Sequence, residues 1–99
     1  MRIQIQERDV AITAFERSYV DDRLALSLAR FSARIAKVVV SLSASEVAGR
    51  LEKRCRIDVD IRPEAVHVED ADADLMTALD RATGRLARTV ARALERDSA

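Results

Sequence analysis

The stretch RCRIDVDIR, residues 54–62, constrains the fold of this chain more than any other segment. Apolar side chains alternate one by one with charged ones along it, and the apolar set is Cys55, Ile57, Val59 and Ile61. Because successive side chains of a β-strand point to opposite faces, this alternation predicts a strand that is buried on one face and solvated on the other. Such a strand needs neighbouring strands and an apolar layer that covers only one face of the resulting sheet.

Three more segments are predicted to be strands of the same sheet. Residues 2–6 alternate strictly, residues 35–44 are β-branched and alternating, and residues 65–69 place two valines on one face. Residues 45–53 lie between two of these strands, contain Gly49 and show no periodicity. We therefore expect residues 45–53 to form a hairpin loop.

Two segments have the apolar spacing of amphipathic helices. Residues 14–32 follow Thr13, which stands three residues before Glu16 in the pattern of a helix-capping box. Residues 72–96 place six apolar side chains within about 80° of a helical wheel. The apolar stripe of the first segment is Val20, Leu24, Leu28 and Phe31, and that of the second is Leu75, Leu79, Ala82, Leu86, Val90 and Ala93.

The order of these elements is β-α-β-β-β-α, which predicts an α+β fold. Every predicted strand has one polar face, so a four-stranded mixed sheet with two helices packed on one face satisfies all the patterns together. The first two strands, joined through a helix, are expected to be parallel, and the other pairs to be antiparallel hairpins. With 99 residues, the chain is expected to form a single domain, residues 1–99.

Five arginines recur along the second helix at spacings of 4, 3, 4 and 4 residues: Arg81, Arg85, Arg88, Arg92 and Arg96. They occupy one arc of the wheel, centred about 120° from the apolar stripe, so they flank the core. Such a row binds a nucleic-acid backbone, neutralises acids within the protein or keeps a surface soluble. On the first helix, Arg23, Arg30 and Arg34 fall on a second basic face with Tyr19 beside them. Two adjacent helices would bring these faces together.

The composition argues against an enzyme. Cys55 is the only cysteine and His67 the only histidine, which excludes an internal disulfide, a thiolate-rich zinc site and a two-histidine metal site. We recognise in the sequence no Ser/His/Asp set, no phosphate-cradling glycine loop and no paired-carboxylate site. We therefore expect no catalytic residues and no cofactor. No apolar run approaches the roughly 20 residues of a membrane span, and the N-terminus lacks the apolar stretch of a signal peptide, which points to the cytoplasm.

An acidic run before the second helix invites comparison with a calcium loop. Asp70, Asp72 and Asp74 occupy the first three ligand positions of an EF-hand, but Leu75 stands where glycine is needed and Arg81 where glutamate is needed. We expect no metal site here. Asp70 or Asp72 is instead the expected N-cap of the second helix.

Both helices carry patterns that occur together in one protein family. In the first, a pattern that combines Tyr-Val, Lys-Leu, a further Leu and Arg-Phe in this order is matched by Tyr19, Val20, Arg23, Leu24, Leu28, Arg30 and Phe31. In the second, a pattern like Asp-Met-Tyr-Ala-Ala-Ile-Asp is matched by Asp74, Leu75, Ala78, Leu79 and Asp80, with Met76 in place of tyrosine and Thr77 in place of alanine. The family's downstream basic positions fall on Arg85, Arg88 and Arg92. With the element order and length, the chain resembles the ribosome hibernation-promoting factor family, also called ribosome-associated inhibitor or sigma-54 modulation proteins, in its short form.

The resemblance implies binding to the small ribosomal subunit, in the channel where tRNA anticodons and mRNA lie, and restraint of translation under stress. It implies an rRNA-binding surface, for which the expected residues are Arg23, Arg30, Arg81, Arg85, Arg88 and Arg92, with Tyr19 as a stacking residue. The chain carries 17 basic and 17 acidic residues, and this neutrality predicts weaker or more salt-sensitive attachment than a basic protein would have. The alternative is a protein-interaction module or a weak homodimer in which the arginine row meets acids of a partner.

Overall fold

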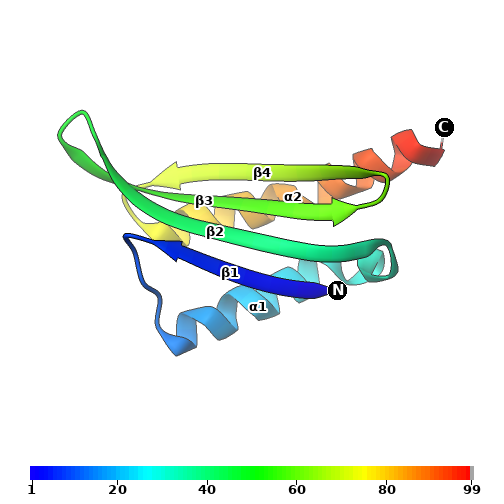
Figure 1. The fold of residues 1–99 in the computed structure, drawn as a ribbon, viewed down its shortest axis with the longest axis horizontal. Helices are drawn as coiled ribbons and strands as arrows, with labels where there is room; N and C mark the ends of the chain where they lie inside the picture. The colour runs from blue at the N-terminus through cyan, green and yellow to red at the C-terminus, as the bar shows by residue number, and fades with distance from the viewer. Residues whose placement is uncertain (99) are drawn as a thin grey trace.

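Four strands form one mixed sheet in the order β1-β2-β3-β4, and two helices lie on one side of it (Figure 1). The computed structural model describes residues 1–98, with the side chains of residues 1–96. The elements are, in chain order, β1 (Arg2–Arg8), α1 (Ala14–Leu28), a 3-10 helix (Ala29–Arg34), β2 (Ile35–Val47), β3 (Arg50–Ile61), β4 (Glu64–Asp72) and α2 (Leu75–Ser98). The predicted β-α-β-β-β-α order and α+β class are confirmed.

The pairing of the strands follows from the lengths of their connections. The β1 strand runs parallel to β2, because α1 carries the chain back to the starting end of the sheet between them. The β2–β3 and β3–β4 pairs are antiparallel, since only short turns join them. Both β1 and β4 are therefore edge strands.

The core lies between the sheet and the helices. Alternate side chains of β2 and β3 are almost completely buried, among them Val38, Val40, Ile57 and Val59, each 0% exposed. The apolar stripe predicted for α2 is buried along its whole length, and its members are Leu75, Leu79, Ala82, Leu86, Val90 and Ala93. On α1 the predicted stripe is buried at Val20, Leu24 and Leu28, while Phe31, in the 3-10 helix, is half-buried. One face of the sheet is thus left open to solvent.

The hairpin loop predicted for residues 45–53 is wrong. The β2 strand continues to Val47 and β3 starts at Arg50, so only Ala48 and Gly49 form the turn. Both turn residues have positive φ, 51° and 78° respectively, as a tight two-residue hairpin turn requires. The hairpin extends past the ends of β1 and β4, where no core exists to impose an apolar alternation, so backbone pairing continues without a sequence pattern that would reveal it.

The helix boundaries also differ from the prediction. The capping box of Thr13 and Glu16 is present, but α1 ends at Leu28 and the chain continues as the 3-10 helix. The α2 helix starts at Leu75, and its cap is Asp74, whose Oδ2 accepts hydrogen bonds from the N–H and the hydroxyl of Thr77 at 3.1 and 2.7 Å. The prediction that Asp70 or Asp72 would be the N-cap is therefore wrong, because β4 extends to residue 72 and takes both acids into the strand.

Candidate nucleic-acid interface

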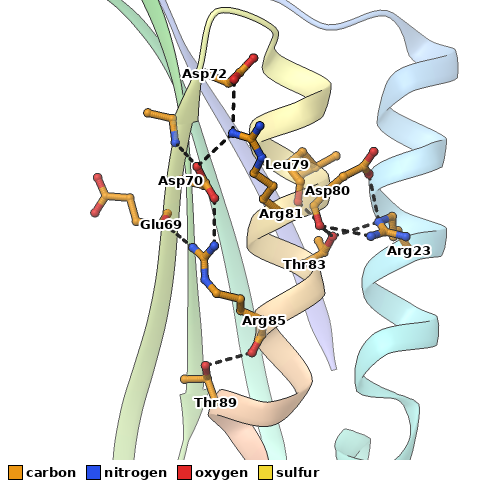
Figure 2. A network of polar contacts seen from close by, with 11 residues as sticks. Arg23, Glu69, Asp70, Asp72, Leu79, Asp80, Arg81, Thr83, Arg85 and Thr89 are labelled. Atoms are coloured by element: carbon orange, nitrogen blue, oxygen red, sulfur yellow. Dashed lines mark hydrogen bonds and ion pairs between the residues drawn. The ribbon is translucent and has the colours of Figure 1, made fainter.

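The first half of the arginine row on α2 is held by acids of β4. The Arg85 Nη1 lies 2.9 Å from Asp70 Oδ2, and its Nη2 donates to the backbone carbonyl of Glu69. The Arg81 Nη1 lies 3.2 Å from Asp72 Oδ1 and 3.9 Å from Asp70 Oδ1. Figure 2 shows both arginines on the side of α2 that faces β4. These two guanidinium groups are partly neutralised within the protein.

The strand register explains why the two acids meet the helix. Asp70 pairs with Cys55, whose side chain is buried under the helices, so Asp70 points to the same side of the sheet. Asp72 lies two residues further along the strand, so its side chain points to the same side as that of Asp70. The apolar alternation of β4 thus continues as an acidic alternation at the end nearest the start of α2. The Arg85 guanidinium, through its hydrogen bond, holds the pKa of Asp70 below its ordinary value.

Arg23 lies on the other flank of α2, between the two helices (Figure 2). Its Nε lies 2.9 Å from the Thr83 hydroxyl oxygen and 3.1 Å from Asp80 Oδ1, and its Nη2 donates to the Asp80 carbonyl at 3.3 Å. Thr83 is only 2% exposed, and its hydroxyl in turn donates to the carbonyl of Leu79. Arg23 therefore joins α1 to α2, and it lies across the helix from Arg81 and Arg85.

Tyr19 is tied to the same carboxylate. Its hydroxyl donates a hydrogen bond of 2.8 Å to Asp80 Oδ1. This bond, with a smaller contribution from partial burial, raises the pKa of Tyr19 above its ordinary value, because a phenolate could not donate to Asp80. The side chain remains partly accessible, since the residue is 37% exposed.

The remaining candidate arginines have open guanidinium groups. Arg88 and Arg92 are exposed. Neither guanidinium group forms an ion pair or hydrogen bond with another residue whose side chain is described. Arg30 is also exposed, and its guanidinium lies over the ring of Phe31, 4.6 Å from the centroid, without an ion pair in residues 1–96. Arg96, which was not among the predicted RNA contacts, approaches Glu64 at 3.6 Å. The row on α2 is thus divided into paired and open arginines.

Sequence reasoning missed the carboxylates that hold these arginines. Asp70, Asp72 and Asp80 contact three of the seven predicted RNA-binding side chains directly, and Asp80 contacts a fourth, Tyr19. A signal for Asp70 and Asp72 was available, since residues 66, 68, 70 and 72 share one parity along a single strand. No comparable signal marked Asp80, because its contact with Arg23 joins residues 57 positions apart.

The open arginines supply the chemistry of an anion-binding surface. A guanidinium donates two parallel hydrogen bonds to a phosphate, and an exposed one needs to lose only water to do so. Arg81, Arg85 and Arg23 would each have to exchange a carboxylate for the phosphate.

No helix within residues 1–98 is long and apolar enough to cross a membrane.

Comparisons with known proteins give a consistent result. The family model described as "Sigma 54 modulation protein / S30EA ribosomal protein" matches residues 3–98. The Thermus thermophilus Protein Y N-terminal domain is 36% identical with a TM-score of 0.74, over 93% of this chain and 98% of that chain. A ribosomal subunit interface protein from Coxiella burnetii, 14% identical, shares the fold with a TM-score of 0.79 over 96% of this chain and 99% of that chain. Comparison with curated proteins yields no match.

Proposed function

Because the chain belongs to the family of sigma 54 modulation proteins and S30EA ribosomal proteins, we propose that it binds the small ribosomal subunit and restrains translation. The contact would be with rRNA of the channel that otherwise holds tRNA and mRNA, in the cytoplasm, under stress conditions. Family membership and the likeness to a ribosomal subunit interface protein support a role at the ribosome. The observation that carries the choice of surface is the pair of open arginines, Arg88 and Arg92, on the exposed side of α2.

The predicted RNA-binding residues fall into two groups in this proposal. Arg30, Arg88 and Arg92 make the first phosphate contacts, since none of them has a carboxylate partner among the described side chains. Arg23, Arg81 and Arg85 contribute less, because a phosphate must compete with Asp80, Asp70 or Asp72. Each such exchange replaces one charge-assisted hydrogen bond by another and so yields little net free energy.

Tyr19 has a similar restriction. Its hydroxyl is already bonded to Asp80, so the ring is held in one orientation. A nucleobase could stack on this ring only next to the Asp80 carboxylate, which repels the phosphates attached to that base. We therefore rank Tyr19 below the three open arginines as an RNA contact.

Cosedimentation with purified small ribosomal subunits at two salt concentrations tests the proposal. Arg88→Ala/Arg92→Ala should weaken binding and reduce the log–log salt slope by about 1.5 units, since each lost phosphate contact removes about 0.7–0.9. The matched control is Arg2→Ala/Arg50→Ala, which removes the same charge from exposed positions on the sheet. Cell-free translation should be inhibited by the wild-type chain and less by the helix variant.

Two results would overturn the proposal. Absence of cosedimentation of the wild-type chain would refute ribosome binding and favour the alternative, an interaction module or homodimer, which size-exclusion mass measurement would then test. Equal binding by the helix and control variants would place the contact surface elsewhere than on α2.

A further inference from the structure

An apolar hollow lies between the N-terminal parts of the two helices. It encloses about 390 Å³ and is lined by Phe15, Glu16, Tyr19, Met76 and Asp80. Phe15 is 82% exposed, the highest value among the large apolar side chains of the described chain. A single exposed ring on a protein surface is ordinary, but here two rings and a thioether gather around one depression. This arrangement has the walls of a small binding site.

The hollow has an acidic rim with unused acceptors. One oxygen of each carboxylate is engaged: Glu16 Oε1 accepts from the Thr13 N–H at 2.9 Å, and Asp80 Oδ1 accepts from the Tyr19 hydroxyl at 2.8 Å and lies 3.1 Å from Arg23 Nε. The other oxygens, Glu16 Oε2 and Asp80 Oδ2, accept no hydrogen bond from any residue whose side chain is described. The lining contains no cationic side chain. Two free carboxylate oxygens thus stand beside two aromatic rings.

We propose that this hollow binds an arginine side chain of a basic polypeptide segment. A guanidinium stacks flat against an aromatic face and donates up to five hydrogen bonds at its edge, which matches the rings of Phe15 and Tyr19 and the free oxygens of Glu16 and Asp80. The aliphatic part of the arginine side chain packs against apolar surface such as Met76. A nucleic-acid chain fits the hollow less well, because Glu16 has no cationic partner among the described side chains and repels phosphates, whereas Arg23 compensates the charge of Asp80 alone.

The hollow is separate from the open arginines of the proposed phosphate contacts, although Tyr19 lines it and Arg23 contacts its rim at Asp80. The hollow lies near the start of α2, whereas Arg88 and Arg92 lie in its second half. The helical layer therefore offers acidic and aromatic chemistry at one end and basic chemistry at the other. A particle that presents both RNA and basic protein segments would engage both ends, but the hollow is tested on the free protein with a peptide, so either proposal can fail without the other.

The sequence supplies an internal reporter for the hollow. Tyr19 is the only tyrosine and the chain has no tryptophan, so tyrosine emission reports on this site alone. The probe is an acetylated and amidated peptide of alternating arginine and glycine, which has no emission of its own. We expect a saturable change in Tyr19 emission that weakens as salt is added. Isothermal titration calorimetry with the same peptide gives the affinity independently of the emission.

Charge-neutralising variants show whether the rim is responsible. Glu16→Gln keeps an amide oxygen for the Thr13 N–H, and Asp80→Asn keeps an acceptor for the Tyr19 hydroxyl. Together they should weaken binding of the arginine peptide by about twofold to 25-fold, since each exposed ion pair contributes up to about a fivefold change in affinity. The matched control, Asp21→Asn/Asp22→Asn, removes the same charge from exposed positions on α1 outside the lining and should leave the affinity unchanged.

Three further titrations complete the test. Phe15→Ala, at a side chain that contributes little to the core, should lower the affinity for the arginine peptide. A lysine–glycine peptide should bind more weakly than the arginine peptide. No saturable response to the arginine peptide, or equal weakening by the control variant, would overturn the inference. A stronger Tyr19 response to an oligouridine than to the peptide would also overturn it and assign the hollow to RNA.

Discussion

Replacing Asp70 and Asp72 with asparagine tests whether β4 keeps the first half of the arginine row neutralised. Asp70 Oδ2 holds Arg85 at 2.9 Å and Asp72 Oδ1 holds Arg81 at 3.2 Å. Asparagine has nearly the same shape, so the backbone pairing of the strand is kept, while the loss of both negative charges weakens the contacts with Arg81 and Arg85. The variant D70N/D72N should therefore lose some stability and expose two more guanidinium groups.

The loss of stability follows from the exposure of the four side chains. The Asp70 side chain is 18% exposed and that of Arg85 44%, whereas those of Asp72 and Arg81 are 30% and 53% exposed. A partly buried charge-assisted bond contributes about 1–2 kcal/mol, and a largely exposed pair about 0.5 kcal/mol or less. We expect the free energy of unfolding at neutral pH to fall by about 1–2 kcal/mol, nearly all of it through Asp70.

The pH dependence of this loss has a definite sign. Arg85 lowers the pKa of Asp70 in the folded state, so the Asp70 carboxylate stabilises the fold above its unfolded pKa of about 3.9. This contribution is lost as the pH falls through the lower folded pKa. The difference in stability between wild type and D70N/D72N should therefore be complete at neutral pH and shrink below about pH 4.

The gain in RNA affinity can be read from its salt dependence. A phosphate contact to single-stranded nucleic acid steepens the log–log salt slope by about 0.7, which is about a threefold change between 50 and 200 mM salt. If Arg81 and Arg85 each gain a contact, the affinity ratio between those two salt concentrations should rise by about sevenfold in total. Binding to small ribosomal subunits at low salt should strengthen accordingly.

Far-UV circular dichroism in urea gives the stability, and cosedimentation with small subunits gives the salt slope. The control D58N/D60N removes two acids from β3, where Asp58 pairs with Arg56 on the open face of the sheet. A salt slope for folded D70N/D72N that equals the wild-type slope would refute masking by β4. If D58N/D60N steepened the salt slope as much as D70N/D72N does, the cause would be the change in net charge and not the release of Arg81 and Arg85.

Three smaller predictions concern separate parts of the chain. Asp80→Asn should lower the pKa of Tyr19 toward its ordinary value, since the hydrogen bond to the carboxylate raises it; ultraviolet titration of the single tyrosine measures this directly. Ala48→Asn should raise the free energy of unfolding in urea by about 0.5–1 kcal/mol, because Ala48 has φ of 51° and asparagine tolerates that region better; a loss would contradict the assigned turn. Burial raises the pKa of the Cys55 thiol to about 12, so a thiol reagent should label it only as the protein unfolds, and rapid labelling of the folded chain would be inconsistent with this.

The sheet and its two helices could be predicted because most of the buried residues lie in periodic patterns. Cys55, Ile57, Val59 and Ile61 alternate with charged residues, and each was predicted to be on the buried face, as it is. An apolar alternation arises only where one face of a strand contacts the core, so the alternation of β2 and β3 stops where the core stops. The β2–β3 hairpin beyond Ser43 pairs through its backbone alone, and its extension was therefore missed.

The candidate site could be predicted only in part, for a different reason. The arginines were visible as a row along one helix, and the family suggested by the two helix patterns is confirmed by the match over residues 3–98. Whether a given arginine is open depends on acids far away in sequence: Arg85 meets Asp70 across 15 residues and Arg23 meets Asp80 across 57. Such contacts are set by strand register and by how the helices lie together, which no local pattern encodes.

Because some arginines are paired and others are open, the net charge of the chain does not predict how strongly it binds RNA. Equal numbers of acids and bases suggested weak or salt-sensitive attachment, but binding depends on the cations left open on one surface, and the sum of all charges does not report them. With Arg30, Arg88 and Arg92 alone in contact, the log–log salt slope should be about −2 to −3, at about 0.7–0.9 per phosphate. With all six predicted arginines in contact, it should be about −4 to −5. Fewer open cations therefore predict binding that is weaker and also less sensitive to salt, and a measured slope distinguishes the two surfaces without any mutation.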